Sequence, residues 1–261
     1  MNVLIIAGID GASGVDDIEM LYKDKNQEGY RTACENMMQD VNAAVAGFFD
    51  GGAQEVYVLD EENNFIDGML DKRAVLLNCD NWEEVVKAKK VDAFAEVCTH
   101  AKAGTEKAFS DRTKDELRWF DFSINGYICG EMFIHAAFMG KYDIPLVMVS
   151  GDNAACIEAT SVFGDVATAP VKRALGRNTA ISVAADEAKK LIYEAAKRGA
   201  CIKDEITPIS VHTPAEIRLT YTRADYCELA LPNRKLDRLD VRTLRKYIDS
   251  FDSCNDFTDM F

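Results

Sequence analysis

Carboxylates and one histidine are the residues of this sequence whose types and positions suggest chemistry. Six of them follow segments that resemble strands, lie in a long loop or begin a segment that resembles a helix: Asp10, Asp60, Glu62, His100, Asp111 and Glu131. One imidazole and several carboxylates that converge on one point can hold a hard or borderline divalent metal ion. Because ligands of α/β proteins bind beyond the carboxyl ends of parallel strands, the sequence predicts a metal site at that edge.

Each of these residues also has a plain structural interpretation. His100 alone fits a structural histidine, and Glu131 alone fits a carboxylate that the dipole at a helix start favours. Glu62 lies in an acidic turn that solvent would cover. The residue types by themselves leave both metal binding and structural roles open.

Three glycines surround Asp10 in the loop after the first apolar run: Gly8, Gly11 and Gly14. Glycine tolerates positive φ angles and close backbone approach, so this loop could press against a ligand at the end of a strand. A nucleotide is an alternative ligand. The spacing is not GxGxxG and no helix begins directly at the loop, so the sequence does not favour a nucleotide.

The elements that would position these residues alternate along the chain. Short apolar runs predict strands over residues 3–7, 55–59, 74–77, 91–98, 144–150, 166–171, 216–221 and 236–241, and Asn125-Gly126 predicts a hairpin. Helical spacing predicts helices over residues 28–49, 81–90, 131–140, 154–163, 184–198, 224–231 and 243–251. This order predicts an α/β fold, with a mostly parallel central sheet flanked by helices and a smaller α+β lobe.

We expect three segments along the chain. Residues 1–205 form an α/β core that includes the hairpin 118–129, and residues 206–251 form an α+β segment packed with it. The polar, non-periodic stretch 101–117 within the core is typical of a long active-site loop. The acidic tail 252–261 is expected to fray.

Bulk properties narrow the choice of partner and compartment. The net charge of −14 would repel nucleic acid and anionic membranes. No apolar run approaches the ~18 residues of a membrane span, and no basic flank of a signal peptide precedes the first apolar run. Eight scattered cysteines without a CxxC pair fit the reduced thiols of a cytoplasmic protein better than a disulfide or zinc-thiolate framework.

Several blocks of sequence resemble one known family. They are Gly11-x-Ser13-Gly14, residues 56–60, His100-Ala101-Lys102-Ala103, Ile124-Asn125-Gly126 followed by Gly130-Glu131, residues 143–152 and residues 168–172. In their order and spacing they resemble the bacterial zinc D-aminopeptidases, self-compartmentalising metallo-aminopeptidases encoded with dipeptide-transport genes. The agreement runs through roughly positions 1 to 250.

The resemblance implies a hydrolase of short peptides that binds zinc and assembles into a ring-like homo-oligomer such as a decamer. It places the metal ligands at Asp10, Glu62, His100 and Glu131. Gly8 stands where the family has the aspartate that bridges two zinc ions, and Glu62 stands where it has a histidine. Exchanging imidazole for carboxylate shifts the preference from zinc toward manganese or magnesium.

The family's catalytic histidine falls at Ser110-Asp111, which makes Asp111 the candidate general base. Three outcomes stay open: one metal ion whose bound water attacks a peptide carbonyl, a metal site without hydrolysis, or a fold without metal. In the last two the protein is a non-catalytic relative that binds a small ligand or peptide. Lys172 and Arg177 either bind a substrate carboxylate or lie on the surface.

Overall fold

The computed structural model describes residues 1–232 and 235–259, which divide into two compact units. The first unit consists of Met1–Ala101, Glu106–Ser110 and Tyr142–Pro208. The second consists of Lys102–Thr105, Asp111–Lys141 and Ile209–Phe261. The chain therefore leaves the first unit three times, after residues 101, 110 and 208, and returns to it twice.

A seven-stranded sheet forms the centre of the first unit, in the order β3-β2-β1-β4-β7-β8-β9. Its strands are β1 (Asn2–Ala7), β2 (Glu55–Asp60), β3 (Val75–Leu77), β4 (Ala93–Thr99), β7 (Leu146–Asp152), β8 (Ala167–Gly176) and β9 (Thr179–Ser182). All neighbours are parallel except β8 and β9. Every residue of β4 is buried, as expected for a central strand covered on both faces. The predicted α/β class with a mostly parallel sheet is confirmed.

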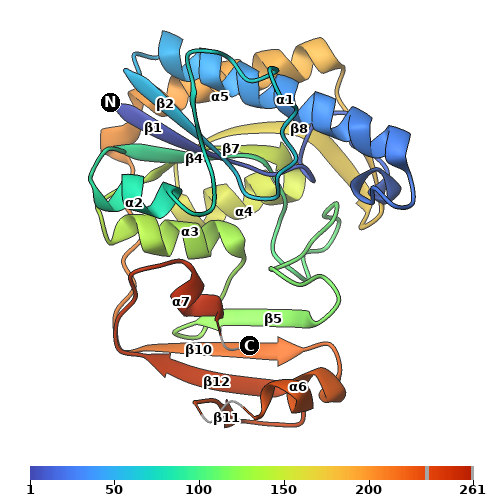
Figure 1. The fold of residues 1–261 in the computed structure, drawn as a ribbon, viewed down its shortest axis with the longest axis vertical. Helices are drawn as coiled ribbons and strands as arrows, with labels where there is room; N and C mark the ends of the chain where they lie inside the picture. Colours follow the sequence, from blue (N-terminus) through green and yellow to red (C-terminus); the bar gives the residue numbers. More distant parts are fainter. Residues whose placement is uncertain (233–234, 260–261) are drawn as a thin grey trace. The chain divides into compact units, whose positions relative to one another are not determined.

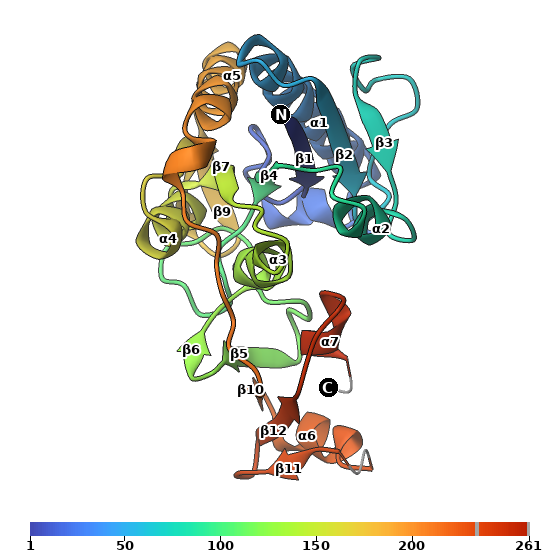
Figure 2. The same cartoon turned by 90° about the vertical axis from the view of Figure 1, so that its left-hand side faces the viewer.

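Helices cover both faces of this sheet. They are α1 (Gln27–Asp50), α2 (Trp82–Lys87), α4 (Asn153–Phe163) and α5 (Ala185–Cys201), with 3₁₀ turns at Ile18–Leu21 and Lys203–Glu205. α1 and α5 lie side by side on one face, and α4 packs against β7 and β8 on the other (Figures 1 and 2). The step from β1 to β2 and the step from β7 to β8 run in opposite directions across the sheet. Right-handed crossovers therefore place α1 and α4 on opposite faces.

The last helix of the first unit extends beyond its predicted end. Gly199 was expected to follow the helix, but α5 continues to Cys201. A Cβ atom at Gly199 would lie 2.9 Å from the carbonyl oxygen of Val147 in β7. This glycine therefore allows the helix to approach the sheet, and it does not end the helix.

The second unit contains an antiparallel sheet of five strands in the order β11-β12-β10-β5-β6. Its elements are β5 (Trp119–Ile124), β6 (Tyr127–Ile128), α3 (Glu131–Gly140), β10 (Ala215–Tyr221), α6 (Ala224–Ala230), β11 (Asp237–Arg238), β12 (Thr243–Ile248) and α7 (Asn255–Thr258). Asn125 and Gly126 both have positive φ angles, of 51° and 80°, as the predicted hairpin turn requires. The hairpin pairs with β10 and so groups with the C-terminal segment, whereas we expected it within the core.

One predicted helix is wrong. Residues 243–251 were expected to be helical, but Thr243–Ile248 form β12, which pairs with β10. The inward residues of the strand include Leu244 and Lys246, and Lys246 is only 2% exposed. A lysine in the middle of the buried face hides the two-residue period of a strand from sequence inspection.

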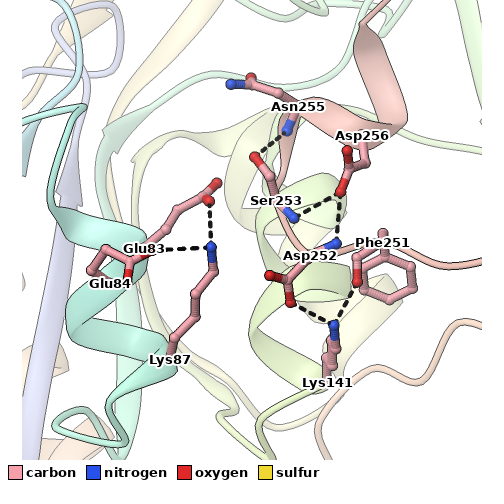
Figure 3. Close-up of polar contacts among 9 residues, drawn as sticks. All are labelled: Glu83, Glu84, Lys87, Lys141, Phe251, Asp252, Ser253, Asn255 and Asp256. Atoms are coloured by element: carbon pink, nitrogen blue, oxygen red, sulfur yellow. Dashed lines mark hydrogen bonds and ion pairs between the residues drawn. The ribbon is translucent and has the colours of Figure 1, made fainter.

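The described residues of the acidic tail, 252–259, are held by hydrogen bonds and are not frayed, and the rest of the predicted tail lies outside the described residues. The Lys141 amine donates to the Phe251 carbonyl at 2.6 Å and to Asp252 Oδ1 at 2.8 Å, as Figure 3 shows. Asp256 Oδ2 accepts hydrogen bonds from the backbone amides of Asp252 and Ser253, at 2.6 and 2.9 Å. Residues 252–259 are thus held by side-chain contacts within the second unit.

Ion pairs form along the helix α2. Lys87 lies 3.6 Å from Glu83 and 3.3 Å from Glu84, at the i,i+4 and i,i+3 spacings of helical ion pairs (Figure 3). In the part of the chain that the structure describes, no helix is both long enough and apolar enough to cross a membrane.

Candidate functional site

Three of the predicted metal ligands follow neighbouring strands of the parallel sheet. Asp10 follows β1, Glu62 follows β2 and His100 follows β4. β1 pairs with β2 on one side and with β4 on the other, in parallel register. The carboxyl ends of these strands therefore meet at one edge of the sheet, where ligands of α/β proteins bind.

The glycines after β1 pack against protein backbone. The Gly8 amide donates to the Val97 carbonyl at 2.9 Å, and the Gly11 amide donates to the Cys98 carbonyl at 2.7 Å. A Cβ atom at Gly11 would lie 2.1 Å from the Thr99 carbonyl oxygen, and one at Gly8 would lie 2.9 Å from that of Cys98. The close approach that glycine permits is thus used against the exit of β4, where we had expected a ligand.

Asp10 is buried in this loop, with 1% of its surface exposed. Its Oδ1 atom accepts a hydrogen bond of 2.6 Å from the Ser110 hydroxyl, which fixes one side of the carboxylate. Ser110 has a positive φ angle of 54°, an unfavourable conformation for a serine. Such strained residues are common at functional sites, and Cys98 and Lys107 in the same region also have positive φ angles.

The buried side chain of Lys172 binds the backbone of the same loop. Its amine donates to the carbonyl oxygens of Asp10, Ala12 and Val15, the last two at 3.0 and 2.7 Å, and it lies 4.3 Å from the centre of the Phe109 ring. Burial lowers the pKa of Lys172 to about 8, while the carboxylate charge of Asp10 opposes that shift. Neither predicted role of Lys172 is therefore found, because its amine is inside the protein and bonded to backbone.

For Arg177 the structure shows one of the two placements expected from the sequence, the one at the surface. The residue is exposed, and its backbone carbonyl accepts a hydrogen bond of 2.8 Å from the Ser110 amide. This bond connects the turn after β8 to the segment that carries Ser110.

His100 and Glu62 differ in their surroundings. His100 is half-buried, and its Nδ1 atom lies 3.0 Å from the Ala101 carbonyl oxygen. A carbonyl can only accept, so Nδ1 is the donor in this contact, and in the neutral imidazole the lone pair then lies on Nε2, as in many metal-binding histidines. Glu62 is exposed, and its Oε2 atom accepts from the Asn64 side-chain amide at 3.0 Å.

Two predicted residues belong to the second unit. The Asp111 carboxylate accepts a hydrogen bond of 2.7 Å from the Gly104 amide. Glu131 is the first residue of α3, and it lies 3.7 Å from the Lys114 amine. This position fits the structural interpretation of Glu131 as a helix-start carboxylate.

The donor set does not fit a two-zinc centre. Among residues 1–232 and 235–259, no three or more His, Cys, Asp or Glu side chains are grouped closely enough to hold a metal ion. Zinc in catalytic sites normally has three protein ligands, and a shared carboxylate offsets the repulsion between two ions. At Gly8, where the family resemblance places that carboxylate, any side chain would need the backbone at Cys98 to shift.

One buried polar group that the sequence did not single out also supports the loop. Asp40 lies in the middle of α1 with none of its surface exposed, and it accepts from the Ser13 amide at 2.7 Å and from the Ser13 hydroxyl at 2.8 Å. Burial raises the pKa of Asp40, and the two Ser13 hydrogen bonds oppose the rise. The available signal was a carboxylate on the apolar face of a helix, between Met37 and Val41.

The fold and these residues define a class of protein before any comparison. It is an α/β protein whose parallel sheet places buried polar side chains at the carboxyl ends of adjacent strands, with an antiparallel second unit inserted into and following the sheet unit. That edge is the usual place for an enzyme site in such sheets.

The chain belongs to the peptidase M55 family, described as D-aminopeptidase, whose model matches residues 1–259. A D-aminopeptidase from Bacillus subtilis (strain 168) is 27% identical over 216 residues, which cover 80% of this chain and 77% of that protein. The family resemblance found in the sequence is therefore confirmed, and it assigns the chain to a family of hydrolases.

One solved structure shares the fold along nearly the whole chain. It is described as the Zn-dependent D-aminopeptidase DppA from Bacillus subtilis, a self-compartmentalizing protease. The TM-score is 0.90 at 21% sequence identity, and the match covers 99% of this chain and 95% of that one. At this identity the likeness establishes the fold.

Proposed function

We propose that this protein hydrolyses short peptides as an aminopeptidase of the D-aminopeptidase type, with one divalent ion in place of two. The observation that carries the proposal is the family match over nearly the whole chain, together with Asp10 and His100 at the ends of adjacent parallel strands. The proposed ligands are Asp10, Glu62, His100 and Glu131, and Asp111 is the proposed general base. The carboxylate-rich donor set favours manganese or magnesium beside zinc.

A second function is favoured by a specific observation. The absence of a three-ligand group from the described residues, together with glycine at position 8, supports a non-catalytic member that binds a peptide or another small ligand. The two functions predict different metal contents, so metal analysis separates them.

The test measures bound metal and hydrolysis together. Protein treated with chelator is dialysed, loaded with zinc or manganese, and analysed by plasma mass spectrometry, while alanyl p-nitroanilides of both chiralities report hydrolysis. We expect about one equivalent of metal and metal-dependent release of nitroaniline. Less than about 0.2 equivalents, without rescue by either metal, would support the non-catalytic function instead.

Two histidine variants make the ligand assignment specific. His100→Ala removes the proposed imidazole ligand, so metal occupancy and hydrolysis should fall together by about tenfold or more. His212→Ala is the matched control, because His212 is exposed in the second unit. Equal occupancy in the two variants would show that His100 is not a ligand.

We also propose that the protein is a cytoplasmic homo-oligomer with the ring assembly that the family resemblance implies. The support is the self-compartmentalizing description of DppA and the buried thiols of Cys34, Cys98, Cys156 and Cys227.

A further inference from the structure

A cavity of about 750 Å³ lies in the first unit, apart from the loop after β1. Its walls come from the segment before α1, the first turns of α1, and residues 63–66 after β2: Lys23, Gln27, Glu28, Tyr30, Arg31, Cys34, Asn63, Asn64, Phe65 and Ile66. Ligand sites for small molecules commonly have volumes of about 300–1,000 Å³, so this cavity can hold a short peptide.

The cavity wall that follows β2, residues 63–66, is held in place by hydrogen bonds. Asp60 accepts hydrogen bonds from the backbone amides of Asn64 and Phe65, at 3.0 and 2.8 Å. The Tyr30 hydroxyl donates to Asn64 Oδ1 and so connects α1 to this wall. Asn64 is 7% exposed. The cavity is therefore framed by hydrogen bonds on two sides.

Lys23 is the cation that could attract an anion to the cavity. Lys23, Arg31 and Glu28 line it, and the carboxylates of Glu62 and Asp60 lie close enough to contribute to the raised pKa of Tyr30 in its wall. Arg31 also pairs with Glu35 at 3.0 Å, outside the cavity. Over the described part of the chain, no carboxylate lies within ion-pair distance of Lys23. The first turns of the 24-residue helix α1 add the positive end of a helix dipole.

The remaining wall residues favour a ligand whose other part is uncharged and partly apolar. Tyr30, Phe65 and Ile66 supply aromatic and aliphatic surface, and Asn63 and Gln27 supply amides that can pair with a peptide backbone. Burial raises the pKa of the Cys34 thiol, so that wall is neutral near pH 7. A ligand with one carboxylate and a small apolar body matches these surroundings.

We propose that this cavity binds the free C-terminal carboxylate of a short peptide, with Lys23 as its main cationic contact and Arg31 as the second. The identity of the ligand as a peptide rests on the proposed function, while the carboxylate specificity rests on the cavity. Glu62 immediately precedes Asn63, which lines the cavity, so a proposed metal ligand is adjacent in sequence to the cavity wall. A carboxylate requirement at this position would limit the substrates to short peptides.

The test is binding in the presence of chelator, where hydrolysis does not interfere. Calorimetry compares alanyl-alanine with its C-terminal amide, in the D,D and the L,L forms, on the full-length protein. We expect saturable binding of at least one free acid and about tenfold or weaker binding of its amide, since a lost charged hydrogen bond is worth about 1.4 kcal/mol or more. Absence of saturable binding, or equal binding of acid and amide, overturns the proposal.

Variants connect the specificity to the cavity. Lys23→Met should weaken binding of the acid by about tenfold and leave binding of the amide unchanged. Lys25→Met is the matched control, because the Lys25 amine lies 4.4 Å from the Tyr22 ring and the residue does not line the cavity. Unchanged acid binding in Lys23→Met overturns the proposal, whatever the metal assay shows. Acid-specific binding without any metal-dependent hydrolysis contradicts the proposed function and leaves the cavity assignment intact.

Discussion

At the scale of single residues, glycine and buried polar groups determine the shape of the loop after β1. Gly8 and Gly11 bring its backbone against the exit of β4, Ser13 is fixed by Asp40, and Lys172 binds the carbonyls of Asp10 and its neighbours. The contact of Gly8 with the Cys98 carbonyl also means that any side chain at position 8 would need the backbone there to shift.

The close contacts of the two glycines predict a graded loss of stability. Gly11→Ala should lower the free energy of unfolding by about 3 kcal/mol, because its Cβ atom would overlap the backbone of Thr99 and Cys98. Gly8→Ala should lower it by about 1–2 kcal/mol, since only one contact is short. Urea denaturation measures both changes.

A third glycine provides the control for this series. Around Gly176 nothing lies within 4 Å of an added Cβ atom, so Gly176→Ala should change the free energy of unfolding by no more than about 0.5 kcal/mol. If Gly11→Ala is as stable as Gly176→Ala, the result would contradict the close packing of the loop against the exit of β4.

At the scale of elements, a buried lysine on β12 holds the C-terminal helix. The Lys246 amine donates to the carbonyl oxygens of Asp256 and Asp259, at 2.9 and 2.6 Å. These carbonyls belong to α7 and the residue after it, where a helix leaves its acceptors unsatisfied. The strand β12 and the tail are therefore stabilised by the same side chain.

This lysine predicts a stability that depends on pH. Burial lowers the pKa of Lys246 to about 8 in the folded protein, against 10.5 for an ordinary lysine. Between these values the unfolded chain binds a proton that the folded protein has released, so the free energy of unfolding rises with pH. From pH 7 to about pH 9.5 this gain should be about 1–2 kcal/mol.

The variant Lys246→Met isolates this contribution. It lacks the titrating amine, so its free energy of unfolding should not gain this increment. The difference from the wild type should therefore grow by about 1–2 kcal/mol as the pH rises over that range. Lys190→Met, at an exposed position of α5, should keep a constant difference from the wild type. A constant difference for Lys246→Met as well would contradict the predicted titration. Denaturation series at several pH values provide the measurement.

At the scale of the whole molecule, charge governs how copies of the chain approach one another. Each copy carries −14, so assembly must overcome repulsion between like charges. Apolar side chains that are exposed in the single chain supply a driving force, among them Leu175, Ile181 and Val183 in or near β8 and β9. Repulsion is screened by salt, whereas burial of apolar surface is not weakened by it.

The proposed homo-oligomer should therefore become more stable as salt is added. Light scattering should give a mass that is a multiple of 29.0 kDa, with dissociation on dilution at about 10 mM salt and less dissociation at about 300 mM. A mass of one chain at every salt and protein concentration would contradict the homo-oligomer. Dissociation that increases with salt would show instead that ion pairs hold the interface.

The sequence by itself determined most regular elements of the sheet unit, although not β9, and it determined the family. Strands such as β1 and β4 and the helix α1 have local patterns, because burial on a fixed face repeats at a fixed period. The blocks around His100 and Glu131 carried the family resemblance without any geometry.

Only the tertiary structure decided what the isolated polar residues do. Lys172, Asp40 and Lys246 each bind backbone groups that are at least ten residues away, and no local period records such partners. The same holds for Gly11, whose neighbour is the exit of a strand about 88 residues later in the chain. Whether a charged residue is buried, and whether a position must be glycine, depends on which segments meet. That is a property of the folded chain.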